Sequence, residues 1–80
     1  MRKTKKWYYA MENKHVIDLL VKHNPSVGLG VLRKWENLVY QEITCKQLEK
    51  ALEQGIALLN RFDVPYKSKY VHGMSKRHSE

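Results

Sequence analysis

The chain has 80 residues and a net charge of +7, with 42% hydrophobic and 29% charged residues. This length fits one small domain, and the composition is that of a folding globular chain rather than of a wholly disordered one. The single cysteine, Cys45, excludes an internal disulfide, and the sequence has neither an apolar leader nor an apolar run of about 18 residues. We therefore expect a cytoplasmic protein with one small hydrophobic core.

All of the excess positive charge lies at the two ends of the chain. Residues 1–6 have a net charge of +4, residues 7–63 are neutral, and residues 64–80 have a net charge of +3. We predict a basic N-terminal arm (1–6), a helical domain (7–65) and a basic, partly disordered C-terminal tail (66–80).

Aromatic residues accompany both basic ends, at residues 7–9 and at Tyr66 and Tyr70. Cations that displace counterions, next to rings that stack on bases, suit a nucleic acid. Alternatively, the rings pack on the core and the charges keep the ends soluble.

The first predicted helix spans residues 14–23, with Asn13 as its N-cap and the dipeptide Asn24-Pro25 after its end. Its apolar residues recur at helical spacing on one face. They are Val16, Ile17, Leu20 and Val21. Residues 7–12 favour either a helical extension or an ordered arm, since no partner strand is evident elsewhere.

The second predicted helix is capped by Ser26, and Gly28 and Gly30 favour a start at Leu29 or later. Its apolar stripe consists of Val31, Leu32, Trp35, Leu38 and Val39. Because exposed amides at a helix start can bind a phosphate, Ser26 is also a candidate phosphate contact.

The third predicted helix begins with a capping box, in which Thr44 and Gln47 exchange hydrogen bonds, and it ends by Val64-Pro65. Gly55 interrupts its apolar stripe and allows a neighbouring helix to approach closely. We expect an all-α fold, a compact three-helix bundle in which the second and third helices form an antiparallel hairpin.

The segment Ser26-Val27-Gly28-Leu29-Gly30-Val31-Leu32-Arg33-Lys34-Trp35-Glu36 resembles the helix-turn-helix of the MerR and excisionase-like families. The second helix of those families commonly reads Val-Ser-x-x-Thr-Leu-Arg-Tyr-Trp/Tyr-Glu. The resemblance covers about a quarter of the chain. It implies that Val31 or Leu32 lies in the core, that Arg33 contacts a phosphate or a base, and that Trp35 is buried. The alternative is that the polar residues of this helix form an ordinary solvated face.

Neither a metal site nor a catalytic centre is predicted. The four histidines lack ligand partners at metal-binding spacing, and Cys45 has no second cysteine nearby. The carboxylates fall on helix faces, where solvated ion pairs are their ordinary role. We expect no enzymatic activity and no cofactor.

Two functions remain. The first is a small regulatory or accessory protein that binds nucleic acid, with DNA preferred, through a helix-turn-helix-like pair and basic arms. The second is a helical interaction module that binds and modulates a larger protein, because the neutral body is rich in apolar residues. A homodimer is compatible with either function. The candidate nucleic-acid-binding residues are Arg2, Lys3, Lys5, Lys6, Ser26, Arg33, Lys34, Asn37, Lys67, Lys69 and Tyr70.

Overall fold

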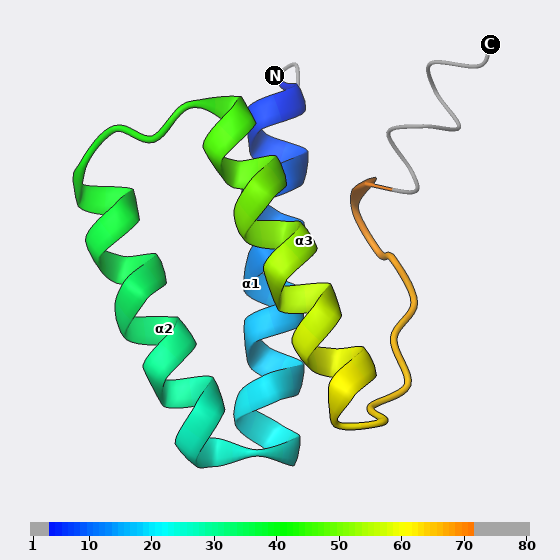
Figure 1. Cartoon of the computed structure of the whole chain (residues 1–80). Helices are drawn as coiled ribbons and strands as arrows, with labels where there is room; N and C mark the ends of the chain where they lie inside the picture. The colour runs from blue at the N-terminus through cyan, green and yellow to red at the C-terminus, as the bar shows by residue number, and fades with distance from the viewer. Residues whose placement is uncertain (1–3, 72–80) are drawn as a thin grey trace, which may run out of the picture.

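The computed structural model describes residues 4–71, which form three α-helices: α1 (Lys5–His23), α2 (Pro25–Tyr40) and α3 (Cys45–Arg61). The predicted all-α three-helix bundle is confirmed, and the described residues contain no β-strand. α2 and α3 run in opposite directions, as expected for a hairpin (Figure 1). Both pack mainly on α1, however, and contact each other only weakly. The bundle is therefore centred on α1.

α1 is longer than predicted. It begins at Lys5, where the Thr4 hydroxyl accepts a hydrogen bond from the backbone amide of Trp7 at 3.1 Å. Residues 7–12 are thus a helical extension. The prediction that Asn13 is an N-cap is wrong, since Asn13 lies buried in the middle of α1. Its side-chain amide donates to the backbone carbonyl of Leu48 at 3.0 Å and so joins α1 to the first turn of α3.

α2 also begins earlier than predicted. Its N-cap is Asn24 rather than Ser26, and Pro25 occupies the first helical position, where its missing amide hydrogen costs nothing. Gly28 is inside the helix and buried. A Cβ atom on Gly28 would lie 2.4 Å from the backbone nitrogen of Val21, whereas one on Gly30 would meet no atom within 4 Å. Gly28 therefore permits close contact between the backbones of α1 and α2.

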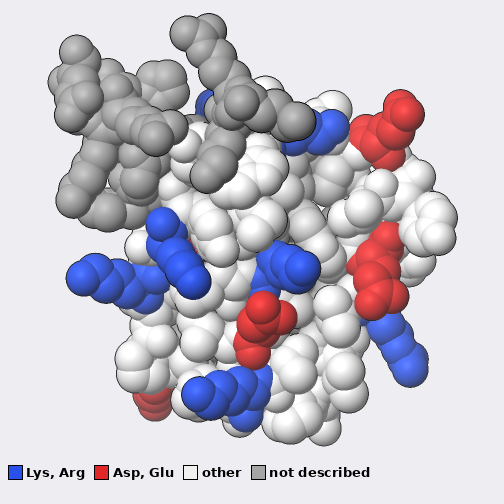
Figure 2. Space-filling view, turned by 180° about the vertical axis from the view of Figure 1, so that it is seen from behind, with Lys and Arg blue, Asp and Glu red and all other residues white. Residues whose placement is uncertain are grey.

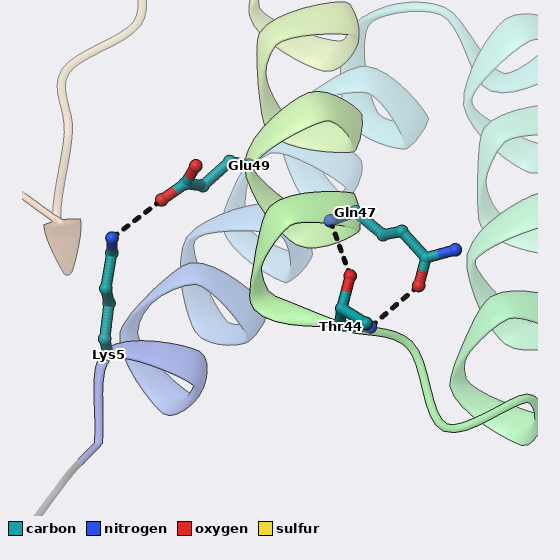
Figure 3. Close-up of polar contacts among 4 residues, drawn as sticks. All are labelled: Lys5, Thr44, Gln47 and Glu49. Carbon is teal, nitrogen blue, oxygen red and sulfur yellow. Dashed lines mark hydrogen bonds and ion pairs between the residues drawn. The ribbon is translucent and has the colours of Figure 1, made fainter.

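The start of α3 confirms the predicted capping box (Figure 3). The Thr44 hydroxyl accepts from the Gln47 amide at 3.2 Å, and the Gln47 side chain accepts from the Thr44 amide at 2.7 Å. The close approach predicted at Gly55 is also confirmed, because a Cβ atom there would lie 2.8 Å from Cγ1 of Val16. α3 ends at Arg61, a little before Val64-Pro65.

The hydrophobic core is built mainly by α1 and α3. Its buried apolar residues are Val16, Ile17, Leu20, Ile43, Leu48, Leu52, Leu59 and Val64. α2 buries only Gly28, and its apolar stripe is half-buried or exposed. Val31, one of the two residues that the resemblance assigns to the core, is half-buried and packs against it. The expectation that Trp35 is buried is wrong, since Trp35 is only half-buried because α2 is covered on one side only. No helix within residues 4–71 has the length and apolar character needed to cross a membrane.

Candidate nucleic-acid interface

The chain segment that follows α3 is fixed to α1 by one buried carboxylate, that of Glu12. Two hydroxyls donate to it, from Tyr66 at 2.7 Å and from Ser68 at 2.8 Å. The backbone amides of residues 69–71 donate to its Oε1 atom at 3.0, 2.8 and 2.9 Å. Glu12 thus organises residues 66–71 against the helix.

These hydrogen bonds decide the charge of Glu12. Burial alone raises the pKa of a carboxyl group, but the bonds from Tyr66, from the backbone amides and from Ser68 outweigh burial. The pKa of Glu12 is consequently held below its ordinary value of 4.5. Burial, together with the hydrogen bond to Glu12, raises the pKa of the Tyr66 hydroxyl above its usual range. At neutral pH the segment therefore binds an ionised carboxylate through neutral donors.

The segment and α1 enclose two adjoining hollows that share His15 and Lys69, and we call them together the basic groove. Its charged side chains are Lys14 and Asp18 from α1 and Lys67 and Lys69 from the segment. All four are exposed. The groove is therefore lined by three cations and one carboxylate, with an imidazole between them.

Figure 2 shows the molecule from the side of α1. Lysine and arginine side chains lie on the left, in the middle and along the lower part of this face, with acidic side chains among them in the middle and at the lower left, and further acidic side chains lie on the right. Cationic and acidic side chains are thus interspersed over much of this side of the molecule, and cationic side chains gather on its left.

Aromatic rings border the basic groove. The ring of Tyr66 lies 6.0 Å from that of His15, and Lys69 Nζ lies 5.7 Å from the centre of the Tyr70 ring. The rings of Trp7 and Tyr70 are nearly perpendicular, with their centres 5.7 Å apart. Tyr9, on the next turn of α1, packs against the hydrophobic core. The aromatic residues of the two basic ends are half-buried, so they are partly packed and partly accessible.

The structure brings together only some of the predicted contact residues. Lys67, Lys69 and Tyr70 line the basic groove. Lys5 instead pairs with Glu49 on α3 at 3.0 Å (Figure 3), and this contact raises the pKa of Lys5. Lys6 is exposed beside it on α1.

The remaining predicted contacts lie elsewhere. Ser26, Arg33, Lys34 and Asn37 are exposed on α2, and no residue of α2 lines the basic groove. Arg2 and Lys3 lie outside the described residues, as does the part of the predicted tail beyond Val71.

Sequence reasoning missed Lys14, His15 and Glu12. A signal for Glu12 was available, because Glu12 and Asn13 precede Val16 and Ile17 by four residues each and so continue the buried stripe of α1. Polar residues at core positions of a helix require buried partners. The partners of Glu12 lie more than fifty residues away in the chain, and no spacing rule identifies them.

Within residues 4–71, no three His, Cys, Asp or Glu side chains come together in a way that could hold a metal ion. Comparisons of the chain with protein-family models, with curated proteins and with solved structures give no match. The function is therefore argued from the geometry alone.

Proposed function

We propose that this protein is a small nucleic-acid-binding protein of regulatory or accessory type, with DNA as the preferred ligand, and that the basic groove contacts the phosphate backbone. The observation that carries this proposal is the attachment of the segment bearing Lys67 and Lys69 to Glu12, next to Lys14. Cations held in place by a folded scaffold lose less conformational entropy on binding than those of a free tail.

The rings next to these cations support the same ligand. Bases in single strands and at helix ends stack on aromatic side chains, while lysines neutralise the backbone. Tyr70 is half-buried between Trp7 and Lys69, so one part of its ring is held by protein. The terminal residues Arg2 and Lys3 would add further sequence-independent attraction.

α2 supplies the second contact in this proposal. Arg33, Lys34 and Asn37 are exposed on it, as a helix that enters a major groove requires. If α2 reads bases, Arg33→Ala should weaken binding to a preferred sequence more than binding to random DNA. Equal losses would reduce Arg33 to a phosphate contact.

The experiment is fluorescence anisotropy of labelled duplex DNA, single-stranded DNA and RNA at several salt concentrations. We expect the double variant Lys67→Gln/Lys69→Gln to reduce the slope of log affinity against log salt on duplex DNA by about 2, because each lost phosphate contact contributes about 0.9. Lys46→Gln/Lys50→Gln removes the same charge from exposed positions on α3 and should leave the slope nearly unchanged. Equal slopes for the two double variants, or no binding by the unmodified chain, would refute the proposal.

The interaction module is the second candidate. The observation that favours it is the incomplete burial of α2, on which Leu29 and Val39 are 51% and 55% exposed. A contiguous apolar surface is typical of a site that binds another protein, and on α2 the half-buried Val31, Trp35 and Leu38 line one groove. Binding of a partner through such a surface should depend little on salt, unlike binding to nucleic acid.

A further inference from the structure

The weak contact between α2 and α3 leaves one corner of the bundle open. In a four-helix bundle each helix packs on two neighbours, and helices on the diagonal stay apart. Here α1 packs on both α2 and α3, which themselves touch only weakly. Figure 1 shows α2 beside α1 and α3 in front of it, with no described segment in front of α2. The three helices thus occupy three corners of a four-helix arrangement.

The open corner is an apolar groove, which we call the α2–α3 groove. It encloses a volume of about 140 Å³ between the three helices. Apolar side chains from all three helices line it: Ile17, Val31, Trp35, Leu38, Ala51 and Leu58. On α2 these side chains follow a spacing of four and three residues, and on α3 a spacing of seven. Such spacings are the pattern by which one helix packs on another.

Burial distinguishes this groove from the core. The apolar residues on the α2 and α3 walls are only half-buried, whereas Leu48, Leu52 and Leu59 on the adjacent side of α3 are buried. The groove walls therefore keep apolar surface that a bound partner could bury. Because the apolar residues recur at helical spacing, a partner helix would fit the groove better than a flat protein surface.

The rim of the α2–α3 groove is positive. Lys34 lines it on the α2 side and Gln54 on the α3 side. Lys50 precedes Gln54 by four residues and Arg61 follows it by seven, so both share the Gln54 edge of α3, and both are exposed.

The nearby acidic residues lie on other sides of their helices. Glu36 lies two residues from Lys34 and so faces away from it. Glu53 is adjacent to Gln54 and points away from the groove, although it follows Lys50 by three residues and so borders that lysine on its outer side. The rim therefore carries three cations. It complements an occupant whose apolar face is bordered by carboxylates, because opposite charges at a rim favour association and like charges oppose it.

We propose that the α2–α3 groove binds an amphipathic helix with acidic flanks from a partner protein, which completes a four-helix bundle. A second copy of this chain fits less well, because an α2 helix placed there would bring its own Lys34 and Arg33 to a positive rim. The inference does not depend on the basic groove, since the two grooves are lined by different residues. Lys34 belongs both to this rim and to the α2 surface proposed to contact DNA, so a partner helix and DNA would compete for that part of α2.

The test uses two fluorescent synthetic peptides with the same leucine-rich apolar face, one flanked by glutamates and the other by lysines. We expect the full chain to bind the glutamate peptide at least about tenfold more tightly than the lysine peptide, a difference of the size expected from rim charges. Ala51→Arg places a long side chain in the groove, where it occupies the space of the partner helix. It should lower the affinity for the glutamate peptide by about tenfold or more.

Asn60→Arg is the matched control, because Asn60 is exposed on α3, lies nine residues from Ala51 and so on the opposite face of the helix, and does not line the groove. This variant should bind the glutamate peptide with an affinity within about twofold of that of the unmodified chain. Lys34→Glu tests the same groove without relying on Ala51→Arg, which could fail to fold. Lys34 is exposed, and reversing its charge should shift the binding preference towards the lysine peptide. Equal affinity for both peptides, or no effect of Ala51→Arg, would overturn the proposal. So would sedimentation showing a homodimer that Ala51→Arg dissociates, because the occupant would then be a second copy.

Discussion

α2 and α3 pack on the same helix, yet they are held in different ways. α3 buries Leu48, Leu52 and Leu59 and is joined to α1 by the Asn13 side chain. α2 buries one glycine, and its backbone lies close to that of α1 at Gly28. Burial of large side chains therefore stabilises the α1–α3 pair, and close backbone contact positions α2. The contrast explains why the apolar stripe of α2 is half-buried or exposed, whereas α3 buries three leucines.

The largest expected difference in stability between the two helices concerns two leucines. Leu59 on α3 is fully buried, and Leu38 on α2 is half-buried at the edge of the α2–α3 groove. We expect Leu59→Ala to reduce the free energy of unfolding by about 3–4 kcal/mol through lost burial and a cavity, and Leu38→Ala by only about 1 kcal/mol. Urea denaturation followed by circular dichroism measures both. Similar costs would show that α2 contributes as much to the core as α3.

The next effect concerns two glycines on α2. Gly28→Ala forces a methyl group against the backbone of α1, and we expect a loss of about 2–3 kcal/mol, typical of overpacking. Gly30→Ala meets open space in the same helix and should stabilise the protein by up to about 1 kcal/mol, because alanine favours a helix over glycine. The same denaturation curves report both changes. If Gly28→Ala leaves stability unchanged or raises it as Gly30→Ala does, the close contact at Gly28 is wrong.

The same two helices show how far the sequence predicts the fold. The capping box at Thr44 and the close approach at Gly55 follow from local chemistry, and both are confirmed. The burial of the α2 stripe does not follow, because an amphipathic pattern says which face is apolar and not whether another element covers it. The helix-turn-helix resemblance likewise implies a buried Trp35, whereas Trp35 is half-buried and lines the open groove.

The candidate site was predictable only in part. The basic and aromatic composition of residues 66–70 is visible in the sequence, and three of the groove residues follow from it. Their position beside Lys14 and His15 depends on Glu12, which accepts hydrogen bonds from donors across the chain. Local propensity contains no information about contacts so distant in sequence, so the groove required the tertiary structure.

Substitution of Glu12 should reduce the free energy of unfolding by an intermediate amount. It tests how the segment after α3, rather than a helix, is held on α1. A glutamine at this position has one acceptor oxygen and presents its own N–H groups to donors. We therefore expect Glu12→Gln to cost about 2 kcal/mol, the order of a buried donor left unsatisfied, and to detach residues 66–71 from α1. Amide hydrogen exchange of residues 69–71 measures the detachment. Unchanged protection of these amides would contradict the assigned role.

The pH dependence has a definite sign. The pKa of Glu12 is lower in the folded chain than in the unfolded chain, so its stabilisation is fully present above the ordinary value of 4.5 and is lost as the pH falls through the folded pKa. Urea midpoints measured from neutral to acidic pH should therefore fall more steeply for the unmodified chain than for Glu12→Gln. Other carboxylates titrate in both proteins, so the difference between the two curves isolates Glu12. Parallel curves would show that Glu12 is not the acid-sensitive group.

The smallest effect compares the N-caps of the two helices. At α3, the Thr44 hydroxyl accepts from the Gln47 backbone amide at 3.2 Å, and the Gln47 side chain accepts from the Thr44 backbone amide at 2.7 Å. At α2, the Asn24 side chain accepts from the Val27 amide at 3.5 Å, the limit for a hydrogen bond. We expect Thr44→Ala to cost about 1 kcal/mol and Asn24→Ala about 0.5 kcal/mol or less. Chemical denaturation resolves a difference of this size when both variants share one slope. A larger loss for Asn24→Ala would mean that α2 depends on its cap more than on Gly28, and that its attachment to α1 is less direct than the backbone contact indicates.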